Sequence, residues 1–346
     1  MNISTLRVTL SLGIAAIILA VLSGCAKESS VDTSNIDKEY LKAWIGANHP
    51  GASASGRGIY ILEDEPGSGA AVTDDDFYLF VEYTSTDLEG NVSATSSKKL
   101  SQQIGSYSPT NYYGDQIVMK DETYTQVGVL DLLDGMRIGG KRVGVIPGWL
   151  NVVLKDYNNK VSGSNSIYTI TLKDKTKDIT SWEIDTLSRY VAIHMPGVDS
   201  TFYGYYCKTL KEPTSSKTFT SDTTYYINYT GRLLNGQVFD TTVEDTAKVY
   251  GFYSSKKSYQ PTKVTPPSGD DDFTKVTIGG SDSSEGVTVV DGFAYCLSKL
   301  RPYEKVVCAF YSQLGYGYSG HGSTIPKFAP IVFEIEVVDK PSDDGN

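Results

Sequence analysis

The sequence has 346 residues, enough for about two domains of ordinary size. Its 41 Asp and Glu residues outnumber 31 Lys and Arg residues, and the net charge of −10 argues against binding nucleic-acid phosphates by bulk attraction. Gly and Pro are too few for a collagen-like or low-complexity chain, while 25 Tyr against 11 Phe suggest many rings with one edge in water. We therefore expect a globular, β-rich protein.

The first 24 residues are typical of a secretory signal. The apolar run Leu10–Leu22 is too short to span a bilayer, which needs about 20 residues, but it suits a signal peptide. It ends in Leu22-Ser23-Gly24-Cys25, which resembles a bacterial lipobox. This resemblance implies that residues 1–24 are removed, that Cys25 is lipidated and that residues 25–36 form a tether. The following Ala26 resembles outer-membrane sorting, so we expect a lipid-anchored protein of the bacterial cell envelope, facing the periplasm or the outside.

The rest of the chain contains an internal repeat. Each copy has a short amphipathic helix, two strands rich in aromatic residues, and later an apolar helix followed by a basic turn and a strand. The first copy places these at 40–45, 58–62, 77–84, 129–136 and 140–142, and the second at 182–191, 203–210, 225–230, 292–297 and 302–310. Strands alternating around one helix predict an α+β fold with two tandem domains, each an antiparallel β-sheet wrapped on a short central helix.

Composition sets the expected boundaries. The charged run 173–178 is interpreted as a solvated linker, which gives domains at 37–176 and 177–340 and a tail at 341–346. The Pro-rich segment 244–272 is predicted to be a long surface insertion in the second domain. Its three consecutive aspartates lack the ligand spacing of a calcium loop.

No metal or cofactor is expected. The cysteines that follow Cys25 are Cys207, Cys296 and Cys308, whose spacing matches no zinc signature and which allow at most one disulfide. A Cys207–Cys308 pair and free buried thiols both remain open. The run 315–320 matches the dinucleotide fingerprint G-x-G-x-x-G, but prolines rather than a helix follow it, so the match is accidental.

Three segments of the second copy together resemble the FKBP-type peptidyl-prolyl cis-trans isomerases. They are YYINYTGRLLNGQVFDTT at 225–242, EGVTVVDGFAYCLSKLRPYEKVVCAF at 285–310 and LGYGYSGHGSTIPKFAPIVFEIEVV at 314–338. Their motifs occur in the family order, and only the insertion stretches the gap between the first two. The resemblance covers about 203–339 well and 58–172 in outline, so it implies two tandem FKBP-like domains.

The resemblance also implies a proline pocket. Its catalytic positions would be Tyr229, Phe239, Asp240, Val290, Phe293 and Tyr316, and its further substrate-binding positions Val289, His321, Ile325 and Phe333. Tyr316 and the Val290 N–H would donate to substrate carbonyls, Asp240 would orient Tyr229, and His321 would shape its loop. The family usually has Trp where this chain has Phe293, which keeps an aromatic platform with less ring area. We expect lower activity or a shifted ligand preference, without loss of activity.

The first copy lacks most of the residues expected to form the pocket. The Gly after Tyr-Thr is replaced by Ser85, the Phe-Asp positions fall at Ser93 and Ala94, and the floor falls at Val129. We interpret this copy as the same fold without a working pocket.

The leading hypothesis is a peptidyl-prolyl cis-trans isomerase acting on Xaa-Pro bonds of exported proteins. Its partners would be unfolded or proline-containing exported proteins, the membrane through the Cys25 anchor, and a macrolide-type ligand, with no nucleic acid. The alternative is a non-catalytic FKBP-like chaperone or protein-binding lipoprotein, and a third option is glycan binding through exposed Tyr.

Overall fold

The computed structural model describes residues 33–219, 223–267, 272–280 and 284–341. The chain divides into two compact units, Met1–Gly51 and Ala52–Asn346. Residues 1–32, with the signal and Cys25, lie outside the described part, so lipidation stays a prediction. In the first unit, α2 (Thr33–Asn48) begins within the segment predicted to be a tether. None of the helices in the described residues has both the length and the apolar character needed to cross a membrane.

The second unit contains two antiparallel sheets. The first joins its strands in the order β1-β2-β6-β7-β3-β4, with β5 paired to β3. The strands are β1 (Ala54–Ser55), β2 (Ile59–Glu65), β3 (Tyr78–Thr86), β4 (Val92–Thr95), β5 (Gln116–Met119), β6 (Lys141–Ile146) and β7 (Ser166–Thr176). The helices of this part are α3 (Lys98–Gln103), α4 (Val127–Leu133) and α5 (Leu154–Asn158). Five of the seven residues of α4 are buried, because the helix packs against the core face of this sheet.

The second sheet has the order β13-β12-β11-β9-β15-β14-β8, with β10 paired to β9. Its strands are β8 (Tyr205–Lys211), β9 (Tyr225–Leu233), β10 (Val238–Thr241), β11 (Thr262–Thr265), β12 (Thr277–Ile278), β13 (Val287–Thr288), β14 (Lys305–Phe310) and β15 (Ile331–Val338). The helices are α6 (Ile179–His194), α7 (Glu244–Val249) and α8 (Asp291–Lys299), with short 3-10 turns η1 (Phe273–Lys275), η2 (Ser312–Leu314) and η3 (Gly317–Ser319).

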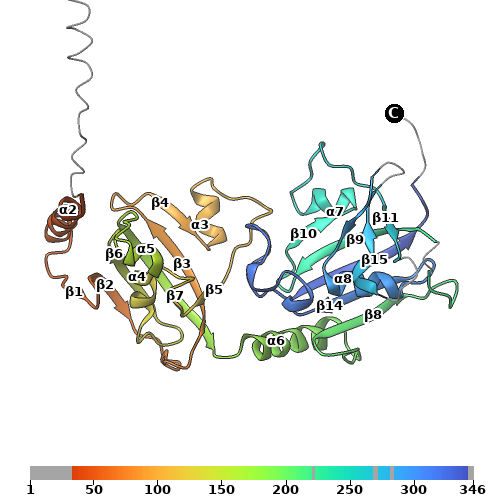
Figure 1. Ribbon diagram of the computed structural model, residues 1–346, viewed down its shortest axis with the longest axis horizontal. Helices are drawn as coiled ribbons and strands as arrows, with labels where there is room; N and C mark the ends of the chain where they lie inside the picture. Colours follow the sequence, from red (N-terminus) through yellow and green to blue (C-terminus); the bar gives the residue numbers. More distant parts are fainter. Residues whose placement is uncertain (1–32, 220–222, 268–271, 281–283, 342–346) are drawn as a thin grey trace, which may run out of the picture. The chain divides into compact units, whose positions relative to one another are not determined.

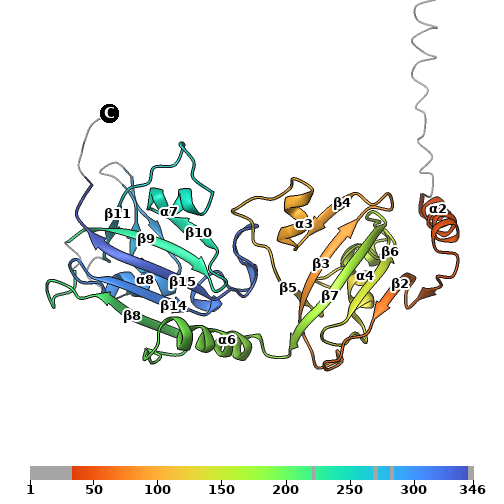
Figure 2. The same ribbon diagram turned by 180° about the vertical axis from the view of Figure 1, so that it is seen from behind.

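Helices cover both faces of this second sheet. Along β14, Val306, Cys308 and Phe310 join the core that contains α8, whereas Ala309 joins the cluster that contains Leu187 of α6. Successive side chains of a strand point to opposite faces, so the apolar run KVVCAF can supply both layers. Figures 1 and 2 show α8 beside β14 and β15, and α6 beside β8 and β14.

The predicted fold class is confirmed: the structure is α+β, with two antiparallel sheets that each pack on a short helix. The domain boundaries stay a prediction. Two smaller expectations are wrong. Most of the charged run 173–178 is not linker, because β7 continues to Thr176 and Lys175 forms an ion pair with Asp76 in which both side chains are largely buried.

The insertion is also more ordered than predicted. Instead of a plain surface loop, its described part contains α7 and β11, and β11 pairs with β9 of the sheet. Ala247 of α7 and Val264 of β11 are fully buried. These two apolar contacts and the added strand pairing anchor the segment, which its polar composition alone did not indicate.

Candidate functional site

A hollow of about 420 Å³ lies between α8 and the second sheet. It is lined by Tyr229, Phe239, Asp240, Ile278, Thr288, Val289, Val290, Phe293, Tyr316, His321, Thr324, Ile325 and Phe333. All ten residues expected to form a pocket thus line one cavity. Sequence reasoning missed Ile278, Thr288 and Thr324. The two threonines directly adjoin residues it named, whereas Ile278 lies at the site because β12 pairs with β11 and β13.

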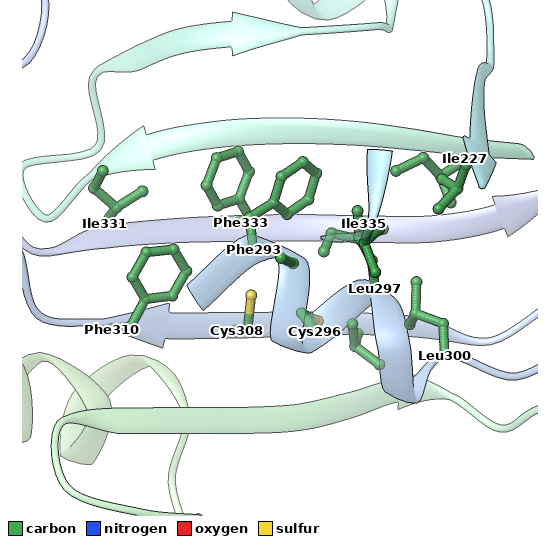
Figure 3. Close-up of a cluster of buried hydrophobic side chains, with 14 of the residues drawn as sticks. Ile227, Phe293, Cys296, Leu297, Leu300, Cys308, Phe310, Ile331, Phe333 and Ile335 are labelled. Atoms are coloured by element: carbon green, nitrogen blue, oxygen red, sulfur yellow. The ribbon is translucent and has the colours of Figure 1, made fainter. Parts of the chain in front are cut away.

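Aromatic rings form the bottom of this hollow. Phe293 of α8 and Phe333 of β15 are stacked, with centroids 4.2 Å apart, and both side chains are almost fully buried. Figure 3 shows the two rings side by side. Phe239 meets Phe333 edge-on at 5.7 Å, and Tyr229 lies 5.4 Å from Phe293. The edge-on and stacked pairs have geometries that aromatic rings favour, so these contacts stabilise the cup.

A glycine in β9 makes room for the cup. Gly231 pairs with Phe333 across the two strands, and a Cβ atom there would lie 2.5 Å from two ring atoms of Phe239. It would also lie 2.8 Å from a ring atom of Phe333. Only a residue without a side chain lets both rings approach this strand.

The helix α8 enters the pocket at its first turn. Val290 is its N-cap residue, where the first backbone N–H groups of a helix have no acceptor within the helix. Gly292 lies against Phe310, and a Cβ there would be 2.5 Å from that ring, so the helix can approach the sheet closely. This close approach places Phe293 over the strands.

A carboxylate and a phenol form the polar edge. The Tyr229 hydroxyl donates to Asp240 Oδ2 at 2.6 Å, and the Thr241 N–H donates to Asp240 Oδ1 at 2.9 Å. The ammonium of Lys257, from the insertion, lies 2.5 Å from Oδ1. Burial, and then the nearby carboxylate, raises the pKa of Tyr229 far above its usual range, so this phenol stays neutral and can donate.

The Gly-rich loop after β14 carries Tyr316, the second tyrosine that lines the pocket. Gly317 and Gly320 have positive φ, and a Cβ at Gly320 would lie 2.3 Å from the Ile325 carbonyl oxygen. The His321 N–H donates to that same oxygen at 2.8 Å, and its ring lies 5.3 Å from the ring of Tyr316. Burial raises the pKa of Tyr316, with Asp240 as a second cause, so its hydroxyl also remains a donor.

The metal, cysteine and glycine-run motifs weighed from the sequence can be located in the described part of the chain. No group of three or more His, Cys, Asp and Glu side chains there could hold a metal ion. Cys207, Cys296 and Cys308 are free thiols, although Cys207 and Cys308 are direct neighbours across β8 and β14. The glycine run 315–320 contains the short 3-10 turn η3, and turns and then β15 follow it, not a dinucleotide-binding helix.

The fold and the cup together define a class: an α+β domain whose short helix and sheet enclose a ring-lined pocket with a few hydrogen-bond donors at its edge. Residues 215–338, somewhat over a third of the chain, match the family model described as FKBP-type peptidyl-prolyl cis-trans isomerase. This part of the chain belongs to that family, and the protein therefore carries a peptidyl-prolyl cis-trans isomerase domain.

Three solved structures are similar to this chain. A peptidyl-prolyl cis-trans isomerase of Pseudomonas syringae pv. tomato is 23% identical over 46% of this chain and 93% of its own, with a TM-score of 0.30. FkpA of Escherichia coli is 20% identical over 51% and 74%, with a TM-score of 0.30. The three FKBP domains of wheat FKBP73 are 13% identical over 81% and 94%, with a TM-score of 0.27. No curated protein matches the sequence.

Proposed function

We propose that the ring-lined pocket isomerises Xaa-Pro bonds in exported proteins. The observation that carries this proposal is the convergence of all ten expected residues on one hollow of about 420 Å³ that stays open between α8 and the sheet.

The chemistry requires no bond to be made or cut. Rotation about the prolyl amide breaks its resonance, and the barrier is about 18–20 kcal/mol. A catalyst must therefore bind the twisted amide better than either planar form. An apolar cup does so by removing water from the carbonyl oxygen, whose partial charge is greatest in the planar, conjugated amide. Phe239, Phe293 and Phe333 would be that cup, with Val289 and Ile325 as its sides.

Polar groups at the edge would then fix the pose of the peptide. The Tyr316 hydroxyl would donate to one substrate carbonyl and the Val290 N–H to a second, while Asp240 holds Tyr229 in place. His321 would act on the loop and not as a proton carrier, because the reaction transfers no proton.

The first half of the chain would support or recruit clients. Its α4 carries Val129 where the second half has Phe293, and β4 carries Ser93 and Ala94 where β10 has Phe239 and Asp240. The second candidate is therefore that the whole protein is a non-catalytic FKBP-like chaperone or protein-binding lipoprotein. Suppression of client aggregation that survives a pocket substitution would support it.

Isomerisation of a series of proline tetrapeptides tests the main proposal. We expect the wild type to accelerate cis-trans exchange above the buffer rate, and Phe239→Ala and Asp240→Ala variants to lose most of this acceleration. A wild-type rate equal to that of buffer, unaffected by either substitution, would show that the pocket does not catalyse.

The cellular setting is a separate proposal. The run from Leu10 to Cys25 supports a lipid-anchored protein of the bacterial envelope, probed by detergent-phase partition of the full chain against a Cys25→Ser variant. Wild type in the detergent phase and the variant in the aqueous phase is the expected result. Equal partition of both would contradict the anchor.

A further inference from the structure

The insertion reaches the pocket through one side chain. Lys257 lies in the loop between α7 and β11, and its Nζ is 2.5 Å from Asp240 Oδ1. The two carboxylate oxygens of Asp240 therefore have different hydrogen-bond partners. Oδ2 accepts from the Tyr229 hydroxyl, and Oδ1 accepts from Lys257 and from the Thr241 N–H. Any rotation of the carboxylate would break contacts on both sides.

The insertion also holds Lys257 in position. Its ammonium lies 5.4 Å from the centre of the Tyr259 ring, and this ring stacks on Tyr253 with centroids 5.4 Å apart. Lys248 of α7 lies 5.1 Å from the centre of the Tyr253 ring, and the Ser254 N–H donates to the Tyr259 hydroxyl at 3.2 Å. These contacts form a continuous path from α7 to the pocket carboxylate.

This ion pair contributes little to folding. The Lys257 side chain is 45% exposed and that of Asp240 is 38% exposed, and pairs so accessible to water add little stability. The Lys257–Asp240 pair instead affects the charge of the pocket. Among the described residues that line the pocket, Asp240 is the one carboxylate, and Lys257 neutralises it at the pocket mouth.

Building on the isomerase function proposed above, we propose that Lys257 is a positioning residue that fixes Asp240 and lets the pocket accept prolines preceded by an acidic residue. With Lys257 in place, an acidic side chain of the peptide meets a neutral ion pair. Without Lys257 it would meet a bare carboxylate, and like charges brought together on binding disfavour the complex. The insertion thus becomes part of the site and determines which sequences the pocket admits.

Kinetics on three tetrapeptides with Glu, Ala or Lys before the proline test this proposal. In Lys257→Met we expect kcat/KM to fall about tenfold for the Glu peptide, about threefold for the Ala peptide, and least for the Lys peptide. Lys257→Arg should restore most of the rate, because it keeps the charge. Lys256→Met is the matched control: it removes an exposed charge from the adjacent position and should leave all three rates unchanged.

A second measurement does not depend on turnover. The ¹³C NMR signal of the Tyr229 ring carbon that carries the hydroxyl reports the hydrogen bond to Asp240. It should shift in Lys257→Met and stay in place in Lys256→Met. An unmoved signal overturns the positioning role, and equal losses on the three peptides overturn the selectivity. If wild type isomerises no peptide while the Tyr229 signal still shifts, the proposed function and the selectivity fail, but the positioning stands.

Discussion

The two sheets repeat one hydrogen-bonded frame. In the first, the hydroxyls of Thr84 and Thr95 share a hydrogen bond of 2.8 Å, and in the second those of Thr230 and Thr241 share one of 2.9 Å. The backbone N–H of the preceding tyrosine donates at 2.9 Å to a hydroxyl in both: Tyr83 to Ser96, and Tyr229 to Thr242. Both sheets therefore contain the hydrogen-bonded frame that positions a pocket, as expected for an internal duplication.

The side chains that fill this frame differ. Gly128 and Gly292 occupy matching places at the starts of α4 and α8, and each lies against a side chain of the facing strand, Ile146 or Phe310. The next residue is Val129 in one helix and Phe293 in the other. Where the second sheet has Gly231, the first has Ser85. The scaffold therefore persists without the aromatic cup, because backbone hydrogen bonds and close packing do not need the rings. A hollow of about 360 Å³ remains at the matching place, lined in part by Tyr83 and Val129.

The largest effect should come from closing the cup. A Gly231→Ala change puts a methyl group within 2.5 Å of Phe239, so both neighbouring rings must move. We expect kcat/KM to fall at least about tenfold, with a loss of about 1–3 kcal/mol in the free energy of unfolding from overpacking. Tetrapeptide kinetics and urea unfolding measure the two effects.

The matched change in the first sheet is Ser85→Ala, which should leave isomerisation as it is. If both variants keep the wild-type rate, the glycine does not make room for the cup in the way described.

The two halves should also respond oppositely to pH. Glu183 of α6 is 1% exposed and accepts from the N–H and hydroxyl of Ser312, and burial raises its pKa to about 7, against an ordinary value of 4.5. As pH rises, the Glu183 carboxyl loses its proton at a lower pH in the unfolded chain than in the folded one. The free energy of unfolding therefore falls between about pH 4.5 and about pH 7, by roughly 3 kcal/mol. In the first half, burial opposes ionisation of Asp76, yet hydrogen bonds from Lys175 and Thr73 lower its pKa, so its contribution is lost as pH falls.

Urea unfolding of the full chain between pH 4 and pH 8 checks these signs. Glu183→Gln should abolish the loss of stability at higher pH, and Asp76→Asn should reduce the loss at lower pH. A wild-type slope that Glu183→Gln leaves unaltered would contradict the assignment to this carboxyl.

A smaller effect should follow from removing one hydroxyl. Tyr229→Phe leaves the ring in the cup but removes its donor to Asp240, and we expect kcat/KM to fall about tenfold, the equivalent of one hydrogen bond to a charged group. Tyr83→Phe in the first sheet is the control and should have no effect on the rate. Equal rates in wild type and Tyr229→Phe would mean that this bond plays no part.

The smallest change in activity should come from adding a ring to the first half. In a chain whose second pocket is closed by Gly231→Ala, Val129→Phe should restore no isomerisation, because Ser93 and Ala94 still replace the ring and carboxylate of β10. Val129 is buried, so the larger side chain should cost about 1–3 kcal/mol of stability. A regained rate would show that the helix residue alone decides between the two halves.

The sequence by itself determined the α+β class and, through its family resemblance, ten of the thirteen residues that line the pocket. Periodic apolar residues predict strands and helices locally, and the three segments carry their motifs at short spacing, so no distant contact was needed to recognise them. Tertiary structure decided the role of polar segments, whose composition does not say what they contact. The charged end of β7 is strand because it pairs with β3, and Lys175 there forms an ion pair with Asp76. Lys257 reaches the pocket edge because a loop brings it to Asp240. Ion pairs between residues far apart in the chain produce no periodic pattern in the sequence. The two charged side chains come together only when the chain has folded, so their pairing cannot be predicted from local sequence.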